Sequence, residues 1–422
     1  WGWDDVLPVF KRSEDYQHGP DEFHGAGGEL RVEERRVSWE ILDAWRDAAE
    51  ECGIPKIDEF NRGDNFGNAY FQMTQRRGRR WSGVRAFLDP VKQRKNLTIM
   101  TGAEIAKLEL GERGGRLSAD GVVLKNGDVV RARREVVLAA GAIGSPQILQ
   151  QSGVGPGSLL QACGVPVRHD LPGVGENLHD HLQIRTIYRV ENTVTLNRRA
   201  NSLFGKAAMA LEYLLFRTGP LTMPPSQLGA FAKSDPSLPS ANMEWHVQPL
   251  SLDKFGSPLH RYDAITPSVC NLQPTSRGHV RIVGDDTAAT PKITLNYLST
   301  DEDCRIAVAG LKKTREIMAA KALQRFAPAE EKPGREIQSD DDMLDAARNL
   351  GTTIFHPVGT CKMGSDPLAV VDDRLRVHGI ERLRVIDASI MPRITSGNTN
   401  APTVMIAEKG AEFMLAERRA NR

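Results

Sequence analysis

The sequence predicts an α/β domain built from two separated segments, with an α+β domain inserted between them. Residues 97–155 and residues 383–420 each contain a buried strand that leads through a turn into a helix, as α/β units do. Residues 183–370 mix short alternating runs with helices in no strict βαβ order, which favours a mostly antiparallel sheet. A length of 422 residues is sufficient for two such cores.

Three elements are predicted before and within the first segment. Apolar residues at helical spacing predict a helix over residues 38–52, with Ser38 as its N-cap. Residues 97–109 are typical of a strand. Residues 121–131 predict a hairpin, because the Asn-Gly pair at 126–127 is a strong signal for a two-residue turn.

The two strand-turn-helix patterns are expected to belong to one α/β unit. In the first, residues 136–140 form the buried strand, Ser145 can cap the helix after it, and Pro146 fits the first position of that helix. In the second, residues 383–392 form a strand and turn, and residues 402–420 form a long helix.

Composition excludes several functional classes. Hydrophobic residues make up 40%, charged residues 26%, and the net charge is +1, so nothing favours nucleic-acid binding. No run of 18 apolar residues indicates a transmembrane segment. The five cysteines are scattered without a CxxC pair, which indicates neither a disulfide framework nor a zinc site. Free thiols fit a reducing compartment, so a cytoplasmic location is expected, with peripheral membrane association left open.

A turn of the shape that holds a nucleotide phosphate lies within residues 134–155. Such a site needs a strand, a tight glycine turn and a helix N-terminus, because the helix end favours negative charge. Residues 134–155 have this shape but lack the G-x-G-x-x-G spacing, as do the glycine-rich runs 153–158 and 173–178. The chain contains no stand-alone dinucleotide fingerprint.

His356 and Asn398 are the residues with the clearest chemistry. His356 lies in FHPVGTCKMG, and histidine is well matched to taking a proton near neutral pH. Asn398 lies 42 residues later, so the two can meet only through the fold. A base beside an amide suits an alcohol, since one takes the hydroxyl proton and the other steadies the developing alkoxide. The alternative for Asn398 and Asn400 is capping of the next helix, with Pro402 in its first turn.

The other histidines carry weaker hypotheses. His179 and His181 have an i, i+2 spacing that a metal could use, but no third ligand is indicated, and no metal site is predicted. His246 lies on an expected strand of the middle domain and could face a cavity, although core packing is the commoner role. His378 has the context of a turn residue.

The chain resembles the glucose–methanol–choline (GMC) oxidoreductases, which use FAD. The resemblance is carried by five motifs in order along nearly the whole chain: GAIGSPQILQQSGVG at 141–155, LPGVGENLHDHL at 171–182, FHPVGTCKMG at 355–364, LRVIDASIMP at 383–392 and SGNTNAPTVMIAEK at 396–409. Together they make the resemblance highly specific. It implies an FAD-binding Rossmann-like domain with an inserted substrate domain. The implied boundaries are 1–90 for a bridging region, 91–182 for the FAD-binding part, 183–370 for the substrate-binding domain and 371–422 for the C-terminal FAD-binding part.

The resemblance also implies roles for particular residues. His356 matches the catalytic histidine of the family, and Asn398 matches a second active-site position that is histidine or asparagine in different members. The positions expected near FAD are Ile105, which passes the adenine, and Ala140, Gly141, Asp387, Ala388, Asn400, Ala401 and Pro402. Candidate substrate-pocket residues are Trp245, His246 and Gln248.

The departure from the family lies at the N-terminus. The first residues, WGWDDVLPVFKRSE, have no initiator methionine and resemble the family segment that comes after its G-x-G-x-x-G unit and its Gly-Gly-Ser-Ser signature. About a hundred residues, the scale of a βαβ unit and its loop, are therefore expected to be lacking, which would leave the FAD-binding domain incomplete in this chain. A separate N-terminal polypeptide carrying the FAD fingerprint, disorder and cleavage are the alternatives.

The function expected from the resemblance is FAD-dependent oxidation of an alcohol, with a primary alcohol favoured, to an aldehyde by a dehydrogenase or an oxidase. The partner is then a small-molecule alcohol. The alternative is a catalytically silent or partner subunit that lacks its flavin-binding half. A serine hydrolase is disfavoured, because no G-x-S-x-G turn occurs.

Overall fold

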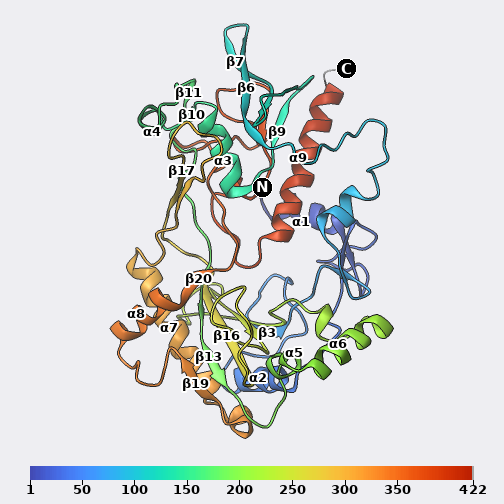
Figure 1. Ribbon diagram of the computed structural model, residues 1–422, viewed down its shortest axis with the longest axis vertical. Helices are drawn as coiled ribbons and strands as arrows, with labels where there is room; N and C mark the ends of the chain where they lie inside the picture. The colour runs from blue at the N-terminus through green and yellow to red at the C-terminus, as the bar shows by residue number, and fades with distance from the viewer. Residues whose placement is uncertain (421–422) are drawn as a thin grey trace.

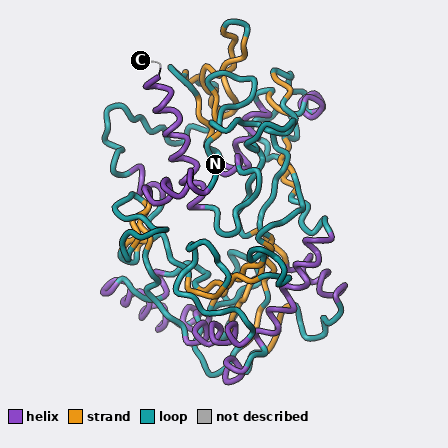
Figure 2. The backbone as a smooth tube through the Cα atoms, turned by 180° about the vertical axis from the view of Figure 1, so that it is seen from behind, coloured by secondary structure: helices purple, strands orange, loops and turns teal. Residues whose placement is uncertain are grey.

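The computed structural model describes residues 1–420 and has two halves, which Figure 1 shows one above the other. The lower half is built on an eight-stranded sheet in which every strand pair is antiparallel. The upper half contains a parallel strand pair, a three-stranded antiparallel sheet and the long C-terminal helix. Seen from behind in Figure 2, strands gather in the middle of the lower half, with helices around them.

The lower half draws its elements from the N-terminal region and the middle of the chain. They are α2 (Glu40–Glu51), β3 (Gly67–Tyr70), β12 (Leu182–Arg185), β13 (Ile187–Arg189), α5 (Leu196–Asn201), α6 (Leu203–Phe216), η2 (Pro220–Thr222), β14 (Leu228–Ala232), β15 (Met243–Gln248), β16 (Ala264–Asn271), α7 (Asp301–Met318), η3 (Lys321–Phe326), β19 (Ala329–Lys332), α8 (Asp340–Leu350) and β20 (Gly351–Thr353). The main path of the sheet runs β19-β13-β16-β15-β14-β3, and β12 joins β16 to β20.

The upper half combines segments from both ends of the chain. They are α1 (Trp3–Ser13), β6 (Ile105–Arg113), β7 (Arg116–Leu124), β8 (Val129–Arg131), β9 (Val136–Leu138), α3 (Gly141–Gln151), β10 (Val154–Gly155), α4 (Gly157–Ala162), β11 (His169–Asp170), β17 (His279–Arg281), β18 (Lys292–Thr294), β21 (Leu383–Val385), η4 (Ala388–Ile390) and α9 (Asn400–Ala420). Small elements lie between the halves: β1 (Glu14–Tyr16), β2 (Leu30–Val32), β4 (Gln75–Arg76), β5 (Arg79–Arg80) and η1 (Val84–Leu88).

The predicted pairing of the two α/β segments is confirmed. β21 lies parallel to β9, with Leu383 opposite Val136 and Val385 opposite Leu138. These four side chains belong to one hydrophobic core, which also takes residues from α3 and α9. The antiparallel sheet expected for the middle of the chain is confirmed as well, and β3 extends it with residues that come before position 90. The domain boundaries themselves stay a prediction.

Local details of the predicted helices differ from the structure. α2 has Trp39 rather than Ser38 at its N-cap, and no side chain caps it. α3 begins at Gly141, so Pro146 lies inside it and not at its first position. Pro146 has no N–H for the carbonyl of Ala142, and that carbonyl instead accepts a hydrogen bond from Thr360 Oγ1 at 2.6 Å. The lost bond is thus replaced, and the helix continues through the proline.

The hairpin prediction is confirmed, and the strand prediction is only partly right. The hairpin is confirmed, because β7 and β8 pair on either side of the turn and Gly127 has a left-handed φ of 91°. The strand predicted over 97–109 is shorter at its start, since β6 begins only at Ile105. The C-terminal helix begins at Asn400, which puts Pro402 in the first turn, where its missing N–H costs nothing.

Candidate active site

The fold brings His356 and Asn398 together between the two halves. His356 lies in the loop after β20, and Asn398 lies in the loop before α9. The side-chain amide nitrogen of Asn398 is 3.3 Å from Nε2 of His356. His356 is 9% exposed, whereas Asn398 is open to solvent. An alcohol that reaches this pair meets a ring nitrogen and an amide donor at the same point.

A chain of hydrogen bonds behind His356 fixes which ring nitrogen carries its proton. His181 Nε2 lies 3.1 Å from the carbonyl oxygen of Leu272, which can only accept, so this nitrogen bears the hydrogen. Burial and the charge of His356 lower the pKa of His181 to about 4, so His181 is neutral and its Nδ1 is an acceptor. His181 Nδ1 lies 3.1 Å from His356 Nδ1, which must therefore be the donor. The lone pair of neutral His356 is left on Nε2, beside Asn398.

The protonation state of His356 also suits a base. Burial lowers the pKa of His356, and the nearby charge of Glu244 partly opposes this. Near neutral pH the imidazole is therefore unprotonated and ready to accept a proton. A base that is neutral before the reaction and charged after it needs a nearby anion, and Glu244 has that position.

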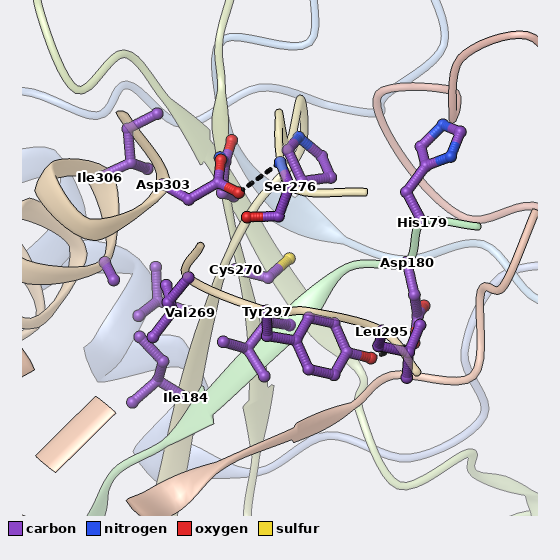
Figure 3. A pocket seen from close by; sticks show the side chains of 15 residues that line it. His179, Asp180, Ile184, Val269, Cys270, Ser276, Leu295, Tyr297, Asp303 and Ile306 are labelled. Atoms are coloured by element: carbon purple, nitrogen blue, oxygen red, sulfur yellow. Dashed lines mark hydrogen bonds between the residues drawn. The ribbon is translucent and has the colours of Figure 1, made fainter. Parts of the chain in front are cut away.

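Asp180 holds the backbone at His356. Its carboxylate accepts a hydrogen bond from the backbone N–H of His356 at 2.9 Å, and others from Tyr297 Oη at 2.6 Å and from Thr353 Oγ1. Figure 3 shows Tyr297 pointing toward Asp180 across a pocket lined largely by apolar side chains such as Ile184. Asp180 lines this pocket and His356 does not, so Asp180 joins the pocket to the backbone of His356.

His179 fixes the loop that carries Asn398. Its Nδ1 donates to the carbonyl of Asn177 at 2.6 Å, and its Nε2 accepts the backbone N–H of Ile394 at 2.9 Å. Burial lowers the pKa of His179 to about 4, which keeps Nε2 free to accept. His179, Asp180 and His181 thus support both members of the pair.

Sequence reasoning missed these supporting roles. The i, i+2 spacing of His179 and His181 suggested a metal at most, and no group of three or more potential metal ligands occurs among residues 1–420. The alternation along an extended segment could have indicated that the two histidines face the same way while Asp180 faces the other. It could not show which loop each would meet.

One face of the lower sheet adjoins the pair, and it carries His246 but not Trp245. Across the sheet, Ile184, Val269 and Trp245 stand opposite one another and belong to the hydrophobic core. Trp245 is fully buried there and donates its indole N–H to Thr314 Oγ1 at 2.8 Å. The prediction of Trp245 as a pocket residue was therefore wrong, because neighbours along a strand point to opposite faces.

The opposite face of the same strands is polar. His246 stands level with Ser268, and Glu244 with Cys270. One carboxylate oxygen of the fully buried Glu244 is 3.0 Å from His246 Nε2. Burial alone would raise the pKa of Glu244, but the interaction with His246 Nε2 lowers it, so the carboxylate is anionic near neutral pH. Glu244 is a residue of the site that sequence reasoning did not identify.

Arg185 shares this polar face with His246. It stands opposite Ser268, and Ser268 stands opposite His246, so Arg185 and His246 are about 10 Å apart across the sheet. Arg185 is 6% exposed, and within the described chain none of its guanidinium nitrogens has a hydrogen-bond partner. Burial lowers its pKa to about 10, which leaves it charged at neutral pH. The guanidinium lies over the ring of Phe255, 4.6 Å from its centroid.

Gln248 continues the polar face two residues beyond His246. Its side-chain amide donates to Ser226 Oγ at 3.0 Å, and its amide oxygen has no partner among the described residues. It makes no hydrogen bond to His356 in the part of the chain that the structure describes. Its role in binding substrate stays a prediction.

On the upper side of the site, Asp387 ties the two α/β segments together. Its Oδ2 accepts the backbone N–H of Gly141 at 2.9 Å and the hydroxyl of Ser145 at 2.6 Å. Its Oδ1 accepts the N–H of Ser389 at 2.8 Å. Asp387 therefore joins the start of α3 to the end of β21, where the carboxyl ends of two parallel strands meet. In open α/β sheets this is the edge at which cofactors bind.

The surroundings of Asp387 fit a flavin nucleotide. Ala140 and Ala401 are exposed, Ala388 is half-buried, and a Cβ placed on Gly141 would meet no atom within 4 Å. These small residues leave room beside the N-termini of α3 and α9, whose free N–H groups favour an anion.

The remaining predicted cofactor positions lie in two places. Asn400 and Pro402 lie in the first turn of α9, close in sequence to Asn398. Ile105 starts β6 in the three-stranded sheet, away from the parallel pair in the topology. Contact of all these residues with FAD stays a prediction.

The structure also answers the alternative of helix capping. Within the described chain, the only side-chain hydrogen bond of Asn398 is to His356, and none runs from Asn398 or Asn400 to an amide of α9. The carbonyl of Thr399 accepts from both the N–H and the hydroxyl of Thr403. The side chain of Asn398 therefore does not cap α9 and points to His356 instead.

Comparisons with known proteins point to one family. The N-terminal model of the GMC oxidoreductases matches residues 1–183, and their C-terminal model matches residues 274–407. The chain is 40% identical over 419 residues to an oxygen-dependent choline dehydrogenase of Pectobacterium carotovorum subsp. carotovorum (strain PC1), covering 98% of the chain and 74% of that protein. It is 37% identical to an alcohol dehydrogenase [acceptor] of Pseudomonas putida, covering 98% and 76%. The crystal structure of pyridoxine 4-oxidase from Mesorbium loti matches with a TM-score of 0.85 and 32% identity, covering 98% and 77%.

These matches correct the expectation about the N-terminus and support the assignment to an FAD-dependent family. The family's N-terminal model matches from residue 1 onward, so the expected lack of the N-terminal segment and the incomplete FAD-binding domain are not confirmed. No comparison supports a separate N-terminal polypeptide, since relatives match 98% of this chain. The fold, the motif order and the relatives agree, and the chain belongs to the GMC oxidoreductases, a family of FAD-dependent enzymes.

Proposed function

We propose that this enzyme oxidises an uncharged primary alcohol to an aldehyde, with His356 as the base and Asn398 as the donor to the alcohol oxygen. The observation that carries the proposal is the hydrogen bond of 3.3 Å between the Asn398 amide and the acceptor nitrogen Nε2 of His356, because an alcohol hydroxyl that takes the place of this bond would contact both groups. FAD, when bound, supplies the acceptor for the hydride of the carbinol carbon.

The two residues have complementary tasks. His356 Nε2 takes the hydroxyl proton, and the resulting positive charge is offset by the buried carboxylate of Glu244. Asn398 donates a hydrogen bond to the oxygen as it gains negative charge, an interaction that grows stronger toward the transition state. Because His356 Nδ1 already donates to His181, the ring cannot turn to present the wrong nitrogen without losing that bond.

The polar face of the sheet favours an uncharged substrate. The relatives include a choline dehydrogenase and an alcohol dehydrogenase, and choline is a cation. Arg185 is charged, buried and without a hydrogen-bond partner on that face among the described residues, so it repels a cation. The carboxylate of Glu244 lies 3.0 Å from His246 Nε2 but forms no hydrogen bond with the described residues, and we assign its charge to offsetting the proton that His356 gains. The unpartnered positive charge of Arg185 then supports a neutral alcohol over choline.

Substrate competition tests the proposal. Turnover is measured with choline and with neutral primary alcohols of similar size, using oxygen and an artificial electron acceptor in turn. Neutral alcohols are expected to give the higher kcat/KM. Arg185→Gln is expected to reduce the difference in kcat/KM between the neutral alcohols and choline. A clear preference of the unmodified enzyme for choline would contradict the assignment.

The catalytically silent alternative predicts a different result. It requires no flavin absorbance and no turnover with any alcohol after incubation with FAD. The intact pair of His356 and Asn398 supports the active enzyme instead.

The five cysteines, all free thiols, support the proposal of a cytoplasmic location.

A further inference from the structure

Helix α6 presents an apolar surface that other parts of the described chain leave open. Figure 1 shows α6 at the right-hand edge of the lower half, beyond the sheet and α5. Leu203 and Phe204 at its start are 84% and 85% exposed. The same surface contains Leu211, Leu214, Leu215 and Phe216 of α6 and Leu221 of η2, each more than half exposed. We call these seven residues the α6 apolar surface.

This exposure is not explained by the packing of α6 itself. Met209 is its only buried residue, and its packing partners are α5 and η2. A helix that is apolar nearly all round is normally found inside a protein core or in lipid. Contiguous apolar surface of this kind on a folded chain marks a site of interaction.

Basic side chains flank the α6 apolar surface at its C-terminal end. The tip of the β4–β5 hairpin packs on Arg217, because a Cβ on Gly78 would lie 2.4 Å from the Arg217 carbonyl oxygen. The hairpin is held there by Arg36, whose Nε donates to the same carbonyl at 2.9 Å. Arg77, Arg79 and Arg80 of this hairpin are all exposed.

These basic groups have no internal counter-charges. Among residues 1–420, the side chains of Arg77, Arg79, Arg80, Lys206 and Arg217 form no ion pair and no hydrogen bond, and Lys206 lies on α6 itself. The one carboxylate on α6 is Glu212, which accepts a hydrogen bond from Thr218. The surface therefore combines exposed Leu and Phe side chains with unpaired positive charge.

We propose that α6 lies on the surface of a lipid bilayer with anionic headgroups. The Leu and Phe side chains enter the boundary between headgroups and acyl chains, and the arginines of the hairpin bind the phosphates. With 14 residues, α6 is about 21 Å long, which is too short to cross the hydrocarbon core of roughly 30 Å. No helix among the described residues is long and apolar enough to span a membrane. The helix therefore lies along the surface.

The unpaired positive charges argue against a second copy of the chain as the partner of the α6 apolar surface. A two-fold dimer would place the same patch on both sides of the interface. The unpaired arginines of one copy would then approach those of the other with no carboxylates to offset them. An anionic bilayer supplies the opposite charge and the apolar environment together.

Vesicle sedimentation with the purified full chain tests the proposal. Vesicles of phosphatidylcholine mixed with phosphatidylglycerol are compared with vesicles of phosphatidylcholine alone, at low and at high salt. Binding is expected to be stronger on the mixed vesicles and to weaken with salt. Phe204→Ser combined with Phe216→Ser is expected to weaken binding at least tenfold on both lipids. Arg79→Gln combined with Arg80→Gln should weaken it about fivefold per charge on the mixed vesicles only.

Matched control variants distinguish binding through the α6 apolar surface from non-specific binding to vesicles. Val283→Ser and Leu415→Ser remove exposed apolar side chains in the upper half and are expected to leave binding unchanged. Circular dichroism checks that each variant is folded. The proposal is overturned if the unmodified chain does not sediment with mixed vesicles, or if the controls lose binding equally. It is also overturned if size exclusion shows a dimer that Phe204→Ser dissociates, because the occupant is then a second copy.

Discussion

The two members of the proposed catalytic pair, His356 and Asn398, are held in very different ways. His356 is nearly buried and is fixed on three sides, by His181 at its ring, by Asp180 at its backbone and by the nearby charge of Glu244. Asn398 is exposed, and its side chain has a single hydrogen bond within the described chain, to His356 itself. The base is therefore preorganised by the fold, whereas the amide is positioned by its loop alone. The comparison predicts that changes around His356 cost more than changes at Asn398.

The largest effect is expected for the base itself. His356→Ala removes the proton acceptor and should lower kcat by about a thousandfold, in the range usual for loss of a general base. The flavin absorbance of the purified enzyme should not change. His18→Ala, which removes an exposed histidine, is the matched control and should have no effect. Near-normal turnover in His356→Ala would show that His356 is not the base.

The buried histidines behind the base should make the fold sensitive to acid. The pKa of His181 is about 4 in the folded chain and about 6.5 when unfolded, so the unfolded chain binds the proton more readily. Stability should therefore be complete above pH about 6.5 and fall between there and about 4, with His181 contributing about 3 kcal/mol. Urea unfolding measured across this pH range gives the slope of the unfolding free energy against pH. In His181→Leu the dependence of the unfolding free energy on pH should be shallower, whereas Ser396→Ala should leave it unchanged, because the hydroxyl of Ser396 bonds only to the amide of Gln273 among the described residues.

His181 is expected to act on the reaction by positioning His356. His181→Leu removes the acceptor for His356 Nδ1–H and should lower kcat/KM by a factor of about 30, since the ring can then turn or change tautomer. His181→Asn restores an acceptor oxygen and should recover part of the loss. Profiles of kcat/KM against pH distinguish this from a folding defect, which would lower activity equally at every pH and would not be rescued.

The smallest effect is expected at the exposed amide. Asn398→Ala should lower kcat about tenfold, the value of one hydrogen bond to a developing charge that water can partly replace. Asn398→His, which keeps a donor, should retain most of the activity, and Ser396→Ala in the same loop should be neutral. A loss in Asn398→Ala as large as that in His356→Ala would show that the loop is as preorganised as the buried side.

The large-scale organisation was predictable from the chain's apolar pattern. Each of the runs at Val136 and Leu383 leads through a turn into a helix, and this repeated pattern made it predictable that the two segments belong to one α/β unit, in which the strands pair in parallel. The prediction at Trp245 failed because β15 is buried on both faces. When both faces of β15 are buried, alternation separates Glu244 and His246 from Trp245 but does not say which set meets the core.

The supporting residues of the site could not be derived from local pattern. His181 is 175 residues from His356, and His179 is 215 residues from Ile394, so their contacts depend on how the halves pack. Pro146 also depended on a distant residue, because Thr360 supplies the hydrogen bond that allows a proline inside α3. The exposure of α6 was equally hidden, since an apolar helical segment is normally taken for core.

The carboxylate of Asp387 has a consequence for the order in which the chain folds. It joins Gly141 across 246 residues and Ser145 across 242, and β21 is the last strand of the described chain. Every strand of the eight-stranded sheet has left the ribosome before residue 383 emerges. Closing so long a loop costs entropy that only late contacts return. The parallel pair of β9 and β21 and the junction at Asp387 should therefore form last during synthesis, after the eight-stranded sheet is already in place.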